Sequence, residues 1–255
     1  MKKVFIILFL LISYKEILSQ GFDWQYSARL PFSTPVFFIG PSASLNYNQN
    51  SGDIILNEGE YQDCCSFKNG NGFGYNLGFK SEYWITGLSA IFSQLSYFQN
   101  NADFKARGRI YPLNDSTNLI TENDFSSQIS YLNLSIGYKY RLDDTHFNLG
   151  AGLNFNLLLS QNSQHFEKII APSDFYFNTN PPSQIRQLTQ FKTSELSNIL
   201  IYPSIHIGYD LNLGLGIYSN IQLIIGIPLN HITKNDDWSK WNFDVNISIL
   251  KGLFY

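Results

Sequence analysis

The chain has 255 residues, of which 15% are charged and 16% are aromatic, and its formal net charge is −3 at pH 7. This acidic balance, without a lysine or arginine cluster, argues against nucleic acid as a partner. After the N-terminal apolar run, no uninterrupted apolar stretch reaches the roughly 20 residues that a membrane-spanning helix needs. A membrane protein of this composition therefore has to cross the bilayer as strands.

The N-terminal segment has the layout of a secretory signal peptide. Two lysines precede the apolar run Val4–Ile12, and Ser19-Gln20-Gly21 offers small residues for cleavage. The run is too short for a transmembrane anchor, and a basic start followed by a short apolar core is typical of an export signal. We therefore expect residues 1–19 to be removed on export. Residues 20–35 then form an N-terminal periplasmic arm or an additional strand, and residues 36–255 form the main domain.

Eight segments alternate apolar with small or polar side chains, and this period of two predicts half-buried strands. They are Phe37–Asn48, Phe73–Tyr83, Leu88–Gln99, Leu132–Arg141, Phe147–Leu157, Ile199–Asp210, Leu215–Ile227 and Trp241–Tyr255. The third segment changes its apolar register partway, which predicts a β-bulge. Pro41 and Pro203 interrupt two other segments, and since proline cannot donate to a strand ladder, we expect bulges there as well.

The connections between these segments fall into two classes. Three are short, at Thr86-Gly87, Asp143-Asp144-Thr145 and Leu211-Asn212, and four are longer and polar, at Gln49–Asn71, Asn100–Ser127, Gln161–Asn198 and His231–Ser239. Short turns on one side and long loops on the other are typical of outer-membrane barrels. We therefore predict an all-β fold, an eight-stranded antiparallel up-and-down transmembrane β-barrel with short periplasmic turns and long extracellular loops.

Alternation alone leaves open whether the apolar face points outward into lipid or inward into a dry core, as in a lipocalin-like secreted barrel. Two features favour lipid. No charge stands mid-strand on the apolar face, where lysine or arginine would cost about 2–4 kcal/mol, and the glycines of the opposite face suit a narrow interior. The last apolar-face residues of the strands that run toward the periplasm are also expected to be interfacial aromatics. They are Tyr83, Tyr140, Tyr209 and Tyr255.

The polar face carries most of the charge, and we expect it to line the lumen. Its candidate network consists of Lys80, Glu82, Lys139, Arg141, His206 and Asp210. Charges in a narrow interior must pair or be hydrated, so we expect a salt-bridged plug that rigidifies the barrel and blocks conduction, with a small gated pore as the alternative. Ser204 and His206 are two apart on one strand, which places them about 6.6–6.8 Å apart. A nucleophile and its base need about 2.6–3.2 Å, so no catalytic residue is expected.

Cys64 and Cys65 are adjacent in the first long connection, and a vicinal disulfide that stiffens this loop is the favoured interpretation. A metal site would need further ligands at short spacing, and none follows this pair. No glycine-rich phosphate loop is present either, so neither a metal nor a cofactor is expected. His231, Asp236, Asp237 and Ser239 cluster in the last long connection, which keeps a lipid-modifying enzyme open as an alternative.

The segment Tyr131–Leu142, the tight turn after it and the glycine-alternating Phe147–Leu157 resemble the PorT-like outer-membrane β-barrel family of Gram-negative bacteria. This family often has a strand that ends in lysine followed by an aromatic residue, as Lys139-Tyr140 does here. The resemblance implies an outer-membrane location. Some barrels of this type are associated with protein secretion or gliding machinery.

Together these features predict a non-enzymatic protein of the bacterial outer membrane with a binding, adhesion or envelope-scaffold role. The long loops are rich in asparagine, serine, glutamine, phenylalanine and tyrosine, which suits adaptable polar contacts around aromatic anchors. The expected partners are outer-membrane lipid, the barrel assembly machinery at the C-terminal strand, and a protein or glycan ligand at the loops. The alternatives are a lipid-modifying hydrolase or acyltransferase, a component of a secretion or gliding machinery, and a small gated pore.

Overall fold

The computed structural model describes residues 37–57, 63–114, 117–142, 145–188, 196–214, 216–234 and 237–253. The predicted signal peptide (residues 1–19), the predicted arm (residues 20–35) and Tyr255 lie outside these ranges. Within them the regular elements are β-strands. The described residues include no helix that is long and apolar enough to cross a membrane.

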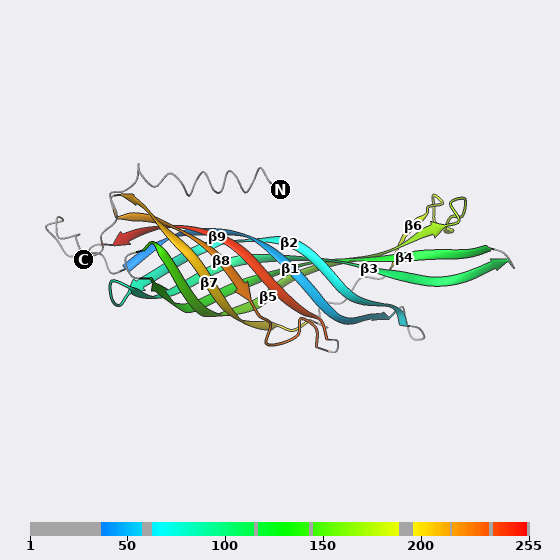
Figure 1. The fold of residues 1–255 in the computed structure, drawn as a ribbon. Coiled ribbons are helices and arrows are strands. Elements are labelled where there is room, and N and C mark those ends of the chain that lie inside the picture. The colour runs from blue at the N-terminus through cyan, green and yellow to red at the C-terminus, as the bar shows by residue number, and fades with distance from the viewer. Residues whose placement is uncertain are drawn as a thin grey trace.

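Nine antiparallel strands make up the described part of the fold. They are β1 (Phe37–Asn57), β2 (Asp63–Trp84), β3 (Ser89–Asn114), β4 (Thr117–Arg141), β5 (Phe147–Ala171), β6 (Ile185–Gln187), β7 (Ile199–Gly214), β8 (Ile217–Gly226) and β9 (Ser239–Leu253). All except β6 join in a closed ring, in which each strand pairs with the next and β9 pairs with β1 (Figure 1). The short β6 adds to β5 outside the ring. The predicted eight-stranded up-and-down antiparallel barrel is therefore confirmed.

The apolar face of the strands points outward. On β9, Val245 and Ile247 are 49% and 48% exposed, whereas Asn246 and Ser248 beside them are buried. The other ring strands expose the same kind of side chain around the barrel: Leu45, Leu77, Leu95, Leu134, Leu153, Ile205 and Leu223. A continuous belt of this kind matches hydrocarbon as its solvent, as in transmembrane barrels. The alternative of a lipocalin-like barrel with a dry apolar core is wrong, because these side chains turn away from the centre.

The inward face of β3 holds a large aromatic ring at Phe92, which is buried. The strand runs without a register shift from Ser89 to Arg107 along β4, so the bulge predicted within Leu88–Gln99 is wrong. The ring fits because two glycines face it. A Cβ added to Gly137 would lie 2.4 Å from a Phe92 ring atom, and one added to Gly152 would lie 3.2 Å away.

The two prolines also lie in regular strands rather than at bulges. Pro41 pairs in register with β2, and Pro203 pairs in register with β5. Each proline lacks a backbone N–H, and each lies where the ladder to the second neighbouring strand is interrupted. Pro41 lies in a gap of the β1–β9 ladder between Ile39 and Ser42, and Pro203 comes just before the first β7–β8 pair at Ser204. The strands therefore tolerate proline without inserting a residue.

One end of the barrel, the turn end, carries the short connections. Thr86 Oγ1 accepts a hydrogen bond from the Ser89 N–H at 3.1 Å, and Thr145 Oγ1 accepts one from the Phe147 N–H at 3.3 Å. Threonine thus closes two of these turns with its side chain. The connection predicted at Leu211-Asn212 lies slightly later, because β7 continues to Gly214, whose φ of 84° suits glycine.

At the opposite end, the loop end, β3, β4 and β5 continue past the barrel as a sheet, to which the short β6 adds (Figure 1). The β2–β3 ladder stops at Phe104 and the β5–β7 ladder stops at Leu157, whereas the β3–β4 ladder runs on to Asn114. We call this protruding sheet the extension; it comprises residues 105–114, 117–124, 166–171 and 185–187. Large parts of the segments that the sequence predicts as loops are therefore β-strand.

Candidate functional site

The lumen is filled in three layers, which we name from the turn end to the loop end. The charge cluster comprises Lys80, Glu82, Lys139, Arg141 and Asp210. Above it lies the chamber, a small cavity beside Phe92 and His206. The aromatic cap closes the loop end with Phe67, Phe104, Phe125 and Trp238.

The charge cluster joins three cations and two carboxylates that come from β2, β4 and β7. Lys139 Nζ lies 3.0 Å from an oxygen of Glu82 and 3.0 Å from an oxygen of Asp210. Lys80 Nζ adds a contact of 3.2 Å to Glu82, and Arg141 Nη2 adds one of 2.8 Å to Asp210. All five side chains are buried. The structure therefore brings together five of the six residues that the sequence predicted as a lumen network.

Polar and aromatic neighbours complete this cluster. The Tyr218 hydroxyl donates to Glu82, and Asn220 Nδ2 donates to Asp210 at 2.7 Å. Lys80 Nζ donates to Asn220 Oδ1 at 2.9 Å and to Gln222 Oε1 at 2.8 Å. The guanidinium of Arg141 lies 4.5 Å from the centre of the Trp84 ring. The alternation of β8 places Tyr218, Asn220 and Gln222 on its inward face, so the sequence could have identified them as members of the lumen network. Trp84 could not be found in this way, because it follows the end of the predicted strand.

His206 does not belong to the charge cluster, which corrects its predicted place. Its Nε2 lies 2.8 Å from Ser204 Oγ, and its ring packs 5.0 Å from that of Phe92, centre to centre. The predicted separation of Ser204 and His206 is therefore also wrong. The predicted value is the distance between the two backbones, whereas the two side chains bend toward each other and form a hydrogen bond. Asp210 is held in the charge cluster and does not orient His206. Ser204 and His206 therefore form a hydrogen-bonded pair without a third member.

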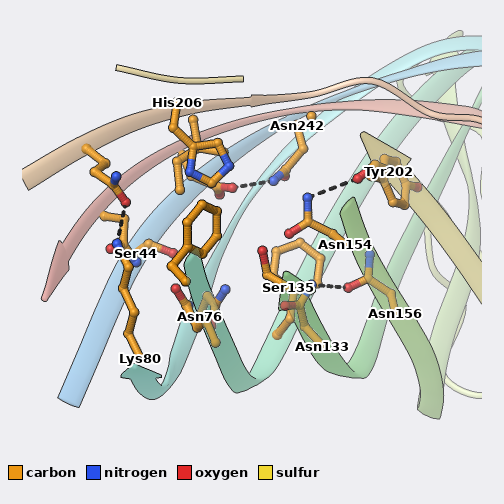
Figure 2. A pocket seen from close by; sticks show the side chains of 18 of the residues that line it. Ser44, Asn76, Lys80, Asn133, Ser135, Asn154, Asn156, Tyr202, His206 and Asn242 are labelled. Carbon is orange, nitrogen blue, oxygen red and sulfur yellow. Dashed lines mark hydrogen bonds between the residues drawn. The ribbon is translucent and has the colours of Figure 1, made fainter. Parts of the chain in front are cut away.

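The chamber is a polar cavity of about 40 Å³ in the middle of the lumen (Figure 2). A cavity of this size holds about three water molecules. Seven buried polar atoms of its lining have no hydrogen-bond partner among the described residues: Ser44 Oγ, Asn76 Oδ1, Tyr202 OH, His206 Nδ1, Lys240 Nζ, Asn242 Oδ1 and Asp244 Oδ1. Because each unpaired buried group costs about 1–3 kcal/mol, this lining is suited to small polar occupants.

Lys240, at the loop end of the chamber, is the feature of the lumen that the sequence analysis missed most completely. Its ammonium nitrogen lies 4.5 Å from the ring centre of Phe98, 5.2 Å from that of Tyr202 and 5.9 Å from that of Tyr131. Aromatic faces stabilise a desolvated cation by about 2 kcal/mol or more, whereas burying an ammonium costs several kcal/mol. The rings therefore offset only part of this cost. Extending the last predicted strand by one residue from Trp241 would have placed Lys240 on its inward face.

The aromatic cap seals the lumen at its loop end. The ring of Trp238 lies 5.4 Å from that of Phe104 and 6.2 Å from that of Phe125, centre to centre. Trp238 Nε1 donates to Asn50 Oδ1 at 3.0 Å. Burial lowers the pKa of the nearby His165, which Glu167 opposes, so a largely neutral imidazole is expected at pH 7. The cap therefore places a cluster of apolar rings at the loop end of the lumen, which the sequence analysis did not predict.

The predicted interfacial tyrosines lie toward the turn end. Tyr83 and Tyr140 are exposed on the outward face, and Tyr209 is half-buried, with its ring 4.9 Å from that of Phe147. Tyr255 lies outside the described residues. Contact of these rings with the membrane–water interface stays a prediction.

The predicted vicinal disulfide falls on side chains that the structure does not describe. The backbone of Cys64 and Cys65 belongs to β2, and Cys65 pairs with Leu56 of β1. The disulfide therefore stays a prediction. Elsewhere in the described ranges, no group of three histidine, cysteine, aspartate or glutamate side chains is placed to hold a metal ion.

A closed ring of tilted strands with an apolar belt outside and a packed lumen defines the class of the outer-membrane-type β-barrel. No family model matches the sequence, and no curated protein matches it. Among solved structures, the chain is similar to Neisserial surface protein A, with 9% identity, a TM-score of 0.37 and coverage of 85% of this chain and 97% of that one. It is also similar to OprG of Pseudomonas aeruginosa, with 10% identity, a TM-score of 0.38 and coverage of 87% of this chain and 98% of that one. A third similar structure is the outer membrane protease OmpT of Escherichia coli, with 10% identity, a TM-score of 0.36 and coverage of 85% of this chain and 96% of that one.

Proposed function

We propose that this protein is a non-enzymatic barrel of the bacterial outer membrane that anchors a binding surface, the extension, outside the cell. In this proposal, residues 1–19 direct export and are removed, and the turn end faces the periplasm. The ligand is a protein or a glycan at the cell surface.

The closed lumen argues that function lies outside the barrel. The charge cluster fills the turn end, the aromatic cap fills the loop end, and the chamber between them has a volume of only about 40 Å³. Eight strands leave space mainly for side chains. The packed interior therefore favours an anchor over a pore. The Ser204–His206 pair lies inside this interior, where a lipid substrate has no room.

The observation that carries the proposal is a row of isoleucines at the far end of the extension. Ile110 of β3 pairs directly with Ile120 of β4, and Ile170 of β5 and Ile185 of β6 lie near this end. Ile110, Ile170 and Ile185 are 50%, 51% and 49% exposed. Exposed apolar patches rimmed by polar residues mark interaction sites, and this patch lies beyond the lipid belt.

Exposed aromatic rings also lie on the extension and in the β5–β6 connection, although Tyr111 faces away from Ile110, because neighbouring residues of a strand point to opposite faces. Tyr111 of β3, and Phe175 and Tyr176 of the β5–β6 connection, are all exposed. Aromatic anchors with adaptable polar neighbours are typical of binding surfaces for proteins and glycans. The extension therefore combines a rigid strand framework with side chains suited to recognition.

Charge placed on the isoleucine row is expected to abolish ligand capture without unfolding the barrel. The test variant combines Ile110→Asp, Ile170→Asp and Ile185→Asp. Crosslinking on intact cells, followed by identification of the captured molecule, should show at least a tenfold loss, while the purified variant keeps its heat-modifiable mobility as a folded barrel. The matched control adds the same three charges at exposed polar positions, as Asn118→Asp, Ser173→Asp and Asn178→Asp. Equal capture by both variants would contradict the proposal.

A further inference from the structure

We propose that one edge of β3 in the extension, along residues 105–110, binds an extended acidic polypeptide segment that adds to the sheet as a further strand. We call this side of β3, which faces away from β4, the open edge. This site rests on the proposed function of the extension as a binding surface, and it narrows the ligand to a protein. The open edge combines an unpaired strand side, a row of cations and small residues between them.

In the extension, β3 is paired on one side only. Its ladder to β2 ends where Phe104 pairs with Gly70, whereas its ladder to β4 continues to Asn114. Beyond this point β1 and β2 diverge from the extension (Figure 1). Among the described residues, no strand pairs with β3 from Lys105 to Asn114 on the side away from β4. An edge of this kind presents a row of backbone N–H and C=O groups to an incoming strand.

The open edge is positively charged. This segment of β3 contains three cations, Lys105, Arg107 and Arg109, and no carboxylate. Lys105 and Arg107 are exposed. Lys105 Nζ lies 3.7 Å from Glu122 and 3.8 Å from Asp124 of β4. Arg107 makes no ion pair among the described residues. The acidic side chains of β4 therefore neutralise this edge only in part.

An added strand brings its side chains within reach of these cations. Residues directly opposite one another on neighbouring strands have Cβ atoms about 4.5–5.5 Å apart, and opposite charges at such positions stabilise the pairing. Glutamate or aspartate at two alternate positions of the ligand therefore lies opposite Lys105 and Arg107. These carboxylates approach from the side that β4 leaves free.

The charge of the whole extension favours an acidic ligand over a second copy of the chain. The extension contains more cations than carboxylates, although the chain as a whole has a net charge of −3. The cations are Lys105, Arg107, Arg109, Lys168 and Arg186, and the carboxylates are Glu122, Asp124 and Glu167. Two copies that met at their open edges would gather Lys105 and Arg107 of both chains in one short ribbon, where like charges repel. We therefore assign the edge to an acidic partner.

Small side chains leave room on the other face of the added strand. Ala106 and Gly108 alternate with the cations along β3 and therefore point to the opposite face. Neither has a side chain larger than a methyl group, so the ligand can carry larger residues there. Ile110, at the end of this segment, is 50% exposed. The expected ligand segment thus alternates acidic with other side chains and places an apolar residue against Ile110.

Synthetic peptides test this site on the purified mature chain in lipid nanodiscs. The probe alternates glutamate with threonine over about eight residues, within the usual length of a strand, and carries a fluorescent label for anisotropy. We expect it to bind at least tenfold more tightly than the same peptide with lysine in place of glutamate. Lys105→Gln combined with Arg107→Gln should weaken binding at least tenfold. The matched control, Lys168→Gln combined with Lys251→Gln, removes two exposed cations away from the open edge and should leave the affinity unchanged.

Methylation of peptide nitrogens separates strand addition from charge attraction alone. The backbone N–H groups of successive residues in a strand point to opposite sides, so methyl groups on the glutamate nitrogens and on the threonine nitrogens block different edges of the peptide. One of these two methylated peptides should lose binding at least tenfold, and the other should keep it. In the wild-type chain, the unmethylated peptide should also slow the hydrogen exchange of backbone amides within residues 105–110 at least tenfold.

Three results would each reject this site: no preference for the acidic over the basic peptide, equal affinity for the two methylated peptides, or unchanged hydrogen exchange in β3. If the glutamine variant does not fold, the wild-type measurements decide by themselves. Absence of peptide binding would leave the proposed function standing if the isoleucine variant still loses capture, and the ligand would then not be an added strand. Equal capture by the isoleucine variant and its control would instead reject the function of the extension itself.

Discussion

Replacing Glu82 by glutamine is expected to destabilise the barrel by about 3–5 kcal/mol, the cost of breaking a buried ion pair. Glu82 accepts from Lys139 and Tyr218 and pairs with Lys80. Glutamine keeps the shape of the side chain but removes its charge. The two ammonium groups then stay buried with Asp210 as the one remaining carboxylate of the charge cluster. Equilibrium unfolding by urea in lipid vesicles, followed by fluorescence, measures this loss.

The matched control for this substitution is Glu122→Gln on the extension. Glu122 also pairs with a lysine, Lys105, at 3.7 Å, but the two side chains are 36% and 71% exposed. Exposed pairs contribute about 0–1 kcal/mol, so this control should shift the unfolding free energy by less than about 1 kcal/mol. If Glu82→Gln and Glu122→Gln shift it equally, the charge cluster is not a structural plug.

Replacing Trp238 by alanine is expected to cost about 3–5 kcal/mol, as for other buried aromatic side chains. Trp238 is 0% exposed in the aromatic cap. The substitution leaves a cavity beside Phe104 and Phe125, and it removes the hydrogen bond to Asn50. Urea unfolding measures the stability, and protease digestion from the loop end measures the opening of the cap.

Two variants bracket this result. Trp238→Phe should recover most of the loss, because it restores the ring against Phe104. Tyr111→Ala removes an aromatic side chain that is 44% exposed on the extension, and surface substitutions of this kind usually change stability by less than about 0.5 kcal/mol. A Trp238→Ala protein as stable and as protease-resistant as Tyr111→Ala would show that the cap does not close the lumen.

The sequence predicted the ring strands because lipid imposes a strict rule on them. Each outward position in the belt must be apolar, so segments such as Phe147–Leu157 alternate without exception. The extension has no such rule, since it lies beyond the lipid belt. Polar residues on both of its faces hid the strand character of Asn100–Ser127, and this segment was predicted to be a loop.

The charge cluster could be predicted for a related reason. A place on the inward face and a position near the turn end can both be read from the local sequence. Together they identified Lys80, Glu82 and Lys139 as members of this cluster. The chamber depends on contacts between distant segments. Phe92 turns inward because Gly137 and Gly152 on other strands leave room for it, and one sequence does not reveal that pairing.

Nitroxide labels along β9 would test most directly which solvent bathes the outward face. In a Cys64→Ser, Cys65→Ser background, single cysteines from Val245 to Ile249 are labelled, and their collisions with oxygen and with a water-soluble nickel complex are measured in lipid vesicles. We expect frequent oxygen collisions at Val245, Ile247 and Ile249, few at Asn246 and Ser248, and weak nickel collisions at all five. Strong nickel collisions at the odd-numbered positions, or no alternation, would show that water surrounds this surface and would contradict the transmembrane barrel.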